Sequence, residues 1–206
     1  MKRRGSSARW LAEHNRDSYV QRARREGRVA RSAYKLIEID ERDKLIRPGA
    51  VVVDLGAAPG GWSEYAVERV GDKGTVIALD LLPMTAPADV TVIQGDFREQ
   101  ECLDELLGVL DGREVDVVLS DMAPNFSGTR SVDQLRSMDL AELALSLAGQ
   151  VLSPRGSFLV KAFHGEGFDD FMRAMREQFT SAAARKPDAS RSRSRETYLL
   201  GRKLSQ

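Results

Sequence analysis

The stretch VVVDLGAAPGGWS, residues 51–63, constrains the fold more than any other part of the chain. Three β-branched residues precede an acid, which is typical of a strand buried on both faces of a sheet. The loop that follows, residues 56–61, has no bulky side chain, so a ligand can approach its backbone closely. From Trp62 onward the sequence fits the start of a helix. Strand, glycine-rich turn and helix in this order open a nucleotide-binding α/β sheet.

The glycine spacing in this loop differs from that of a dinucleotide-binding protein. Gly56 is followed by three other residues before Gly60 and Gly61. A pyrophosphate-binding loop places its second glycine two positions after the first. The loop therefore suits a nucleoside better than a dinucleotide. A tight turn between strand and helix that binds no ligand is the alternative.

Segments of strand character and of helix character alternate along the rest of the chain. We expect strands near 50–55, 75–80, 90–94, 115–120, 156–161 and 196–201, and helices over 31–46, 131–152 and 167–179. This alternation predicts an α/β fold with a mostly parallel sheet and helices on both faces. With 206 residues the chain fits one domain, which we place at residues 29–206. We expect the preceding residues, 1–28, to be a basic and partly mobile segment.

Charged side chains follow the predicted strands where those strands end. The four residues concerned are Asp80, Asp96, Asp121 and Lys161. The carboxyl ends of parallel strands share one edge of a sheet, so we expect these side chains to meet near the glycine-rich loop. An acid at a strand end can also simply cap the next helix. Four charged groups at one edge are more consistent with a ligand site.

The acids around the loop bear on the identity of the ligand. Asp80 lies 20 positions after Gly60, within reach of the ribose hydroxyls of a bound nucleoside. Residues 48–150 carry 18 acidic and 6 basic side chains, which favours a cation over a diphosphate. We therefore expect S-adenosylmethionine as the cofactor. An NAD(P)-dependent oxidoreductase on the same kind of sheet is the alternative.

The two ends of the chain are basic, although the net charge is zero. Residues 1–47 hold 14 basic and 7 acidic side chains, and residues 151–206 hold 11 and 6. Such flanks favour a polyanionic partner, and solvated surface charge is the alternative. The single cysteine, the lack of an apolar leader and the lack of a membrane-length apolar run predict a cytoplasmic protein. No Cys/His grouping has zinc spacing, so we expect no catalytic metal.

Several motifs together resemble the FtsJ-type 2′-O-ribose methyltransferases. They are RSAYKL, DLGAAPGGWS, ALDLLPM, QGDF, SDMAPNFSGT, GSFLVKAFHGEGFD and RKPDASRSRSRETYLL. They occur in order from about residue 25 to the end of the chain. The resemblance implies a Rossmann-like S-adenosylmethionine-dependent methyltransferase sheet whose last strand is antiparallel.

The resemblance also implies specific site residues. The implied catalytic residues are Lys161, Lys35, Asp121 and Glu196, with Lys161 as the catalytic lysine. The implied cofactor-binding residues are Gly60, Trp62, Asp80, Asp96 and Asp121. The strand pattern independently places Lys161 at the ligand edge. Lys35, on a helix before the sheet, is assigned by resemblance alone.

The implied reaction is S-adenosylmethionine-dependent 2′-O-methylation of a ribose, that of a uridine in large-subunit (23S) ribosomal RNA. We find no additional RNA-binding module in the sequence, which favours the assembled large ribosomal subunit as partner. We also expect the enzyme to be monomeric. Transfer RNA is an alternative substrate, and a non-catalytic RNA-binding assembly factor is an alternative function. Lys161 could act as a neutral base or as a charged group that orients the hydroxyl, and both roles stay open.

Overall fold

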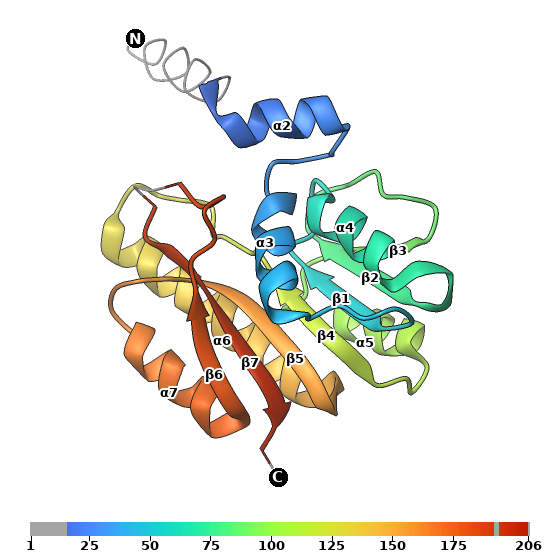
Figure 1. Ribbon diagram of the computed structural model, residues 1–206. Helices are drawn as coiled ribbons and strands as arrows, with labels where there is room; N and C mark the ends of the chain where they lie inside the picture. The colour runs from blue at the N-terminus through green and yellow to red at the C-terminus, as the bar shows by residue number, and fades with distance from the viewer. Residues whose placement is uncertain (1–15, 192–193, 206) are drawn as a thin grey trace.

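The computed structural model describes residues 16–191 and 194–205, in which seven strands form one sheet (Figure 1). The strands are β1 (Val51–Leu55), β2 (Thr75–Asp80), β3 (Val90–Gln94), β4 (Val115–Ser120), β5 (Leu152–Phe163), β6 (Phe179–Arg185) and β7 (Glu196–Leu204). Their spatial order is β3-β2-β1-β4-β5-β7-β6. The order in which strands are added reverses at β1: β2 and β3 lie on one side of it, and the next strand, β4, lies on its other side and also runs parallel to it. This reversal point is where ligands bind in such sheets.

The sheet is parallel except at β7. The pairs from β3 to β5 are all parallel, whereas β7 runs antiparallel to both of its neighbours, β5 and β6. This confirms the prediction of a mostly parallel sheet whose last strand in the chain is antiparallel. The first residue of β7, Glu196, therefore lies at the same edge as the carboxyl end of β5.

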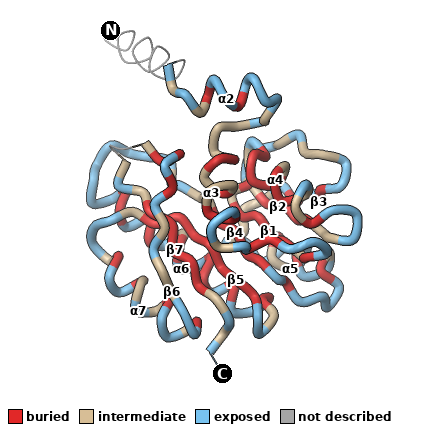
Figure 2. The backbone as a smooth tube through the Cα atoms, in the orientation of Figure 1, coloured by how far each residue is buried: buried red, intermediate tan, exposed pale blue. Residues whose placement is uncertain are grey.

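Helices cover both faces of the sheet (Figure 1). Alternate strand residues enter two separate cores, with Val53 in one and Val52 in the other. Figure 2 shows the buried residues concentrated along the central strands. The first core includes side chains of α5 (Gln100–Leu110), α6 (Arg130–Val151) and α7 (Phe168–Gln178), and the second those of α3 (Ala33–Asp43) and α4 (Gly61–Val70).

Besides the single-turn 3-10 helix Gly71–Lys73, three described elements were not predicted. β6 is an edge strand rich in alanine, a residue with low strand propensity, and its conformation depends on pairing with β7. Phe179, expected at the end of a helix, is the first residue of this strand. α5 follows Asp96, in a segment where the sequence predictions place no helix, although its leucines recur at helical spacing. The third element, helix α2 (Ser18–Glu26), lies within the basic N-terminal segment.

Helix α2 has a clear local cause. The Asp17 side chain accepts hydrogen bonds from the backbone N–H groups of Tyr19 and Val20, and so caps the helix. Val20 and Ala23 bury the apolar side of the helix. The expectation of partial mobility covers residues 1–28. Of these, residues 1–15 lie outside the described residues. Among the described helices, none is both long and apolar enough to span a bilayer.

Candidate active site

The glycine-rich loop lies at the carboxyl end of β1, as its sequence predicts. Gly56 has a φ of 74°, and a Cβ atom there would lie 2.5 Å from Met122 Cγ. Gly60 has a φ of 111° and directly precedes α4. Only glycine adopts both conformations without strain. The space that a side chain would take is occupied by Met122 beside Gly56 and by Met84 beside Gly60, so the loop, called the cradle below, is tightly packed in the free protein.

Asp80 holds this loop in place. One of its carboxylate oxygens accepts a hydrogen bond from the Ala58 amide at 2.9 Å, and the other accepts one from the Leu82 amide at 2.8 Å. The predicted cofactor residue is therefore in contact with the predicted cofactor loop.

Asp96, which follows the adjacent strand β3, is paired with a neighbour in the chain. Its carboxylate accepts hydrogen bonds from Arg98 Nε at 2.9 and 3.0 Å. The Arg98 guanidinium holds the pKa of Asp96 below its usual range. The structure thus puts Asp96 at the expected edge of the sheet, ion-paired with Arg98.

Trp62 is the predicted cofactor residue whose side chain has another role. Its indole is 2 % exposed, donates a hydrogen bond to the Ser32 carbonyl at 2.9 Å, and packs 5.6 Å from the Tyr198 ring. The side chain thus joins α3, α4 and β7. The backbone N–H groups in the first turn of a helix lack partners within that helix. A contact between Trp62 and a ligand would therefore use its main chain.

Asp54, the acid at the end of β1, is a polar residue of the site that the sequence analysis did not single out. It is fully buried, and its Oδ2 accepts a hydrogen bond from Ser63 Oγ at 2.7 Å. Its Oδ1 has no hydrogen-bond partner among the described residues. Burial, together with the charges of Asp121 and Asp80, raises the pKa of Asp54 to about 7. An unpaired buried acceptor beside two further carboxylates favours a cationic ligand. The sequence feature that could have identified Asp54 is the occurrence of an acid within an otherwise apolar strand.

Lys161 and Asp121 form an ion pair in the interior of the site. Lys161 Nζ lies 3.1 Å from Asp121 Oδ1 and donates a hydrogen bond to the Asp121 backbone oxygen at 2.6 Å. The Tyr198 hydroxyl donates to the same Oδ1 at 2.7 Å. Burial acts to raise the pKa of Asp121, but the charges of Lys161 and Lys35 outweigh it, so this pKa lies below its usual range. Asp121 therefore accepts as a carboxylate.

Strand register explains why these groups meet. Lys161 on β5 pairs with Tyr198 on β7, and Phe163 pairs with Glu196. Side chains two positions apart on a strand lie on the same face, so all four point to one side of the sheet. Tyr198 was not predicted as a site residue, although its place two positions after Glu196 was a usable signal.

Lys35 and Glu196 form a second ion pair beside the first. Lys35 Nζ lies 2.8 Å from Glu196 Oε1, and each side chain is 13 % exposed. Burial acts to raise the pKa of Glu196, but Lys35 outweighs it and holds this pKa below its usual value. Lys35 Nζ also lies 5.6 Å from the ring centre of Tyr198. Tyr198 thus contacts both pairs, and the four predicted catalytic residues are brought together.

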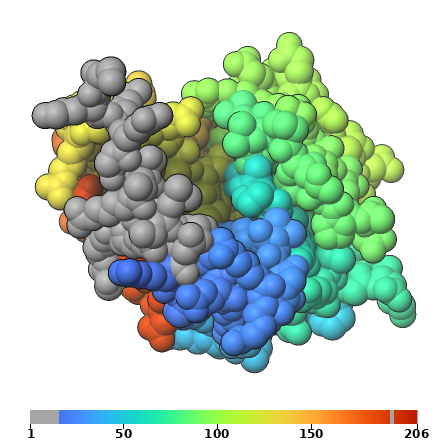
Figure 3. All heavy atoms as spheres, turned by 90° about the horizontal axis from the view of Figure 1, so that it is seen from above, coloured from blue at the N-terminus to red at the C-terminus, as the bar shows by residue number. Residues whose placement is uncertain are grey.

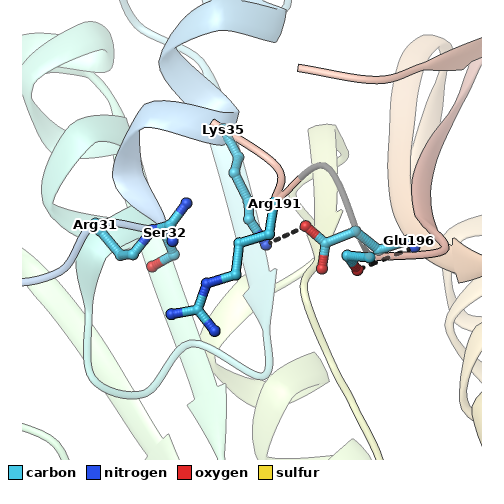
Figure 4. A pocket seen from close by; sticks show the side chains of 6 residues that line it. Arg31, Ser32, Lys35, Arg191 and Glu196 are labelled. Atoms are coloured by element: carbon cyan, nitrogen blue, oxygen red, sulfur yellow. Dashed lines mark hydrogen bonds and ion pairs between the residues drawn. The ribbon is translucent and has the colours of Figure 1, made fainter. Parts of the chain in front are cut away.

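A pocket of about 460 Å³ opens beside the second ion pair (Figure 4). Its lining residues are Arg31, Ser32, Lys35, Arg191, Ser194 and Glu196. The surface is visibly hollowed between the blue, cyan-to-green and yellow parts of the chain (Figure 3). The site thus combines an acidic cradle at the glycine-rich loop with a pocket lined by three basic side chains. Such an arrangement can bind a cationic nucleoside and a polyanion side by side.

The arginines of the N-terminal segment make contacts within the protein. Arg28 forms two hydrogen bonds with Glu68, at 2.5 and 2.9 Å. Arg22 pairs with Glu26 at 2.8 Å and lies 4.4 Å above the ring centre of Tyr34. These two arginines therefore help to fix the segment in place. No cluster of three or more His, Cys, Asp and Glu side chains in the described part of the chain is arranged to hold a metal ion.

Comparison with known proteins gives consistent matches. The FtsJ-like methyltransferase family matches residues 28–204. Ribosomal RNA large subunit methyltransferase E of Alkalilimnicola ehrlichii is 62 % identical over 201 residues, which cover 98 % of this chain and 96 % of the relative. The protein of the same name from Marinobacter nauticus is 54 % identical, with 98 % of each chain covered.

Solved structures agree at the level of the fold. A Plasmodium falciparum protein described as a ribosomal RNA methyltransferase superposes with a TM-score of 0.76 and 26 % identity. The match covers 85 % of this chain and 97 % of that one. Since the family match spans residues 28–204 and both relatives are more than half identical over nearly their full lengths, the chain belongs to the FtsJ-like methyltransferase family.

Proposed function

We propose that this methyltransferase transfers a methyl group from S-adenosylmethionine to the 2′-hydroxyl of a uridine ribose in large-subunit ribosomal RNA. The observation that carries the proposal is the pair of contacts Lys161–Asp121 and Lys35–Glu196, joined by Tyr198, at the mouth of the glycine-rich loop. The names of the two relatives support the RNA class. We further propose that the enzyme acts as a monomer in the cytoplasm, on the assembled subunit.

The surroundings of the loop fit the proposed cofactor in charge. Asp80 and Asp121 lie close enough to Asp54 to raise its pKa, and one buried oxygen of Asp54 lacks a donor among the described residues. Next to Gly60 lies the Met84 side chain, which is flexible and has to move where a ligand approaches this glycine. When bound, S-adenosylmethionine supplies a reactive methyl group on a positively charged sulfur. We propose that the residues that hold it are Gly60, Trp62 through its main chain, Asp80, Asp96 and Asp121.

We propose that the protein accelerates the reaction chiefly by alignment. A hydroxyl oxygen that gains negative charge meets a positive centre, so charge is cancelled rather than created in the transition state. Electrostatic stabilisation of the transition state therefore contributes little, and positioning of the reacting groups supplies most of the rate enhancement. Lys161 is suited to this role because Asp121 fixes its ammonium through two contacts. This ion pair supports the role of an orienting group over that of a neutral base, and the proton of the hydroxyl then leaves to solvent as the oxygen–methyl bond forms and the sulfur–methyl bond breaks.

The decisive test is the location of the methyl group. Large ribosomal subunits from cells that lack the gene are incubated with the purified protein and labelled S-adenosylmethionine, alongside free ribosomal RNA and transfer RNA. We expect one 2′-O-methyluridine in the large-subunit RNA, found by mapping 2′-O-methyl groups. Methylation of transfer RNA, methylation on a base, or RNA binding without transfer would each contradict the proposal.

Cofactor identity has its own test. S-adenosylmethionine and S-adenosylhomocysteine should compete for one site in calorimetry, and NAD should displace neither. Asp80→Asn should weaken cofactor binding roughly tenfold, because it removes charge-assisted hydrogen bonds to the ribose and to the loop. An exposed acid far from the loop, Asp72, gives the matched control as Asp72→Asn. Tighter binding of NAD than of either adenosyl compound would contradict the assignment.

A further inference from the structure

Asp17 uses its two carboxylate oxygens for different contacts. Its Oδ1 accepts hydrogen bonds from the Tyr19 amide at 3.0 Å and the Val20 amide at 3.4 Å, which caps α2. Its Oδ2 is in an ion pair with Arg31 Nη1 and lies 3.7 Å from Arg191 Nε. Its side chain is 14 % exposed. One oxygen therefore completes a helix cap, and the other faces two arginines from distant parts of the chain and offsets part of their charge.

Both of these arginines line the pocket beside the second ion pair (Figure 4). Arg31 is fixed in orientation because its Nη2 donates to the Ala189 carbonyl. Glu196, the one carboxylate among the lining residues, is already paired with Lys35 at 2.8 Å. Without the charge of Asp17, the two guanidinium groups would therefore present an uncompensated positive site to the pocket.

We propose that Arg31 and Arg191 bind a phosphodiester group of the RNA substrate, and that Asp17 occupies the place of this phosphate in the free protein. A guanidinium recognises carboxylate and phosphate oxygens with the same geometry, so one can replace the other. The inference rests on the proposed function, because it takes RNA as the substrate.

The position of the pocket favours a phosphate of RNA over a free anion. Lys35 and Glu196 line the same pocket, so a phosphate bound there lies next to the ribose that is to be methylated. RNA also brings many phosphates at once, and their combined contacts can displace a carboxylate that a single free anion displaces poorly.

Displacement of Asp17 leaves helix α2 attached. The Tyr19 hydroxyl donates to Glu38 at 2.8 Å, and the Tyr34 hydroxyl donates to Glu26 at 2.6 Å. Ala23 packs with Tyr34 and Ala189 in a small apolar cluster. The exchange moves the whole Asp17 carboxylate and costs its two cap hydrogen bonds, but these other contacts keep α2 in place.

The test is Asp17→Asn, which keeps an oxygen to cap α2 and removes the charge. Binding of a fluorescein-labelled RNA hairpin, measured by anisotropy at low salt, should become about three- to tenfold tighter. Arg191→Gln alone should weaken binding, and Asp17→Asn should give little gain in that background. Asp188→Asn is the matched control, because this exposed acid lies near Arg191 in sequence and changes the net charge equally.

Three outcomes would overturn the inference. They are unchanged RNA affinity in a folded Asp17→Asn protein, equal gains from Asp17→Asn and Asp188→Asn, and a gain for inorganic phosphate without a gain for RNA. If Asp17→Asn does not fold, Asp17→Ser replaces it, because serine also caps a helix without charge. Methyl transfer by the wild-type protein is measured separately, so that failure of the proposed function is distinguished from failure of this inference.

Discussion

Replacing Lys161 with alanine is expected to lower turnover by about two to four orders of magnitude, with little change in cofactor affinity. The change removes the amine that we propose positions the ribose hydroxyl, and it leaves the Asp121 carboxylate with Tyr198 as its remaining contact on Oδ1. Lys161→Arg should not restore the rate. The planar guanidinium has a different geometry, and the lysine side chain, 8 % exposed, has little free space around it.

The measurement is single-turnover methyl transfer at saturating cofactor, with Lys73→Ala as the control. Lys73 is an exposed lysine in the short 3-10 helix before β2, at the opposite edge of the sheet. Near-normal turnover in Lys161→Ala would remove this residue from the mechanism. A pH profile of the wild-type rate separates the two roles of the amine. A rate that rises tenfold per pH unit indicates a neutral base, and a flat profile indicates an orienting group.

The second large effect is expected at Asp54, in the stability of the cofactor-free protein. Burial raises the pKa of this carboxyl from its ordinary range to about 7. The protonated form thus favours the folded state, and this contribution is fully present below about pH 4 and is lost as the pH rises through 7. Asp54→Asn does not titrate. The difference in unfolding free energy between variant and wild type should therefore shift in favour of the variant by a few kcal/mol across this range.

Urea unfolding of both proteins between pH 4 and pH 8 measures this difference, because most other titrating groups cancel in the comparison. Ser63→Ala is a useful companion variant, since it removes the hydroxyl that donates to Asp54 Oδ2 and should raise the pKa of the acid further. Added S-adenosylmethionine should stabilise the wild type more than Asp54→Asn at pH 8. Parallel stability curves for Asp54→Asn and the wild type would contradict the expectation.

Residues at strand ends were predictable. The two-residue repeat of strands and the 3.6-residue repeat of helices identify the elements, and the position of each strand end follows from them. Once β1, β2, β4 and β5 are identified as parallel strands, Asp80, Asp121 and Lys161 must share an edge. Lys35 was not predictable in this way. Its place depends on how α3 packs against α4, and a helix periodicity alone does not reveal which neighbour a helix contacts.

Other features could not be predicted, because they depend on contacts between residues that are far apart in the sequence. β6 has a weak strand sequence and is formed by pairing with β7, whose position in the sheet was not known from the sequence. Asp17 looks like an ordinary helix cap, and its pairing with Arg191 depends on the folded position of the loop before β7. The sequence shows an acid at position 54. That its Oδ1 lacks a hydrogen-bond partner among the described residues depends on how the interior packs, and this could not be predicted.

The position of β7 in the sheet has a consequence for how the enzyme is made. β7 lies between β5 and β6, although both of these strands precede it in the chain. During synthesis, β6 therefore has no partner strand in the sheet until residues 196–204 emerge from the ribosome. Those same residues bring Glu196 to Lys35 and Tyr198 to Asp121. A nascent or truncated chain that lacks them can bury much of its core, but it holds neither contact, so the proposed catalytic site is completed only in the final step of folding.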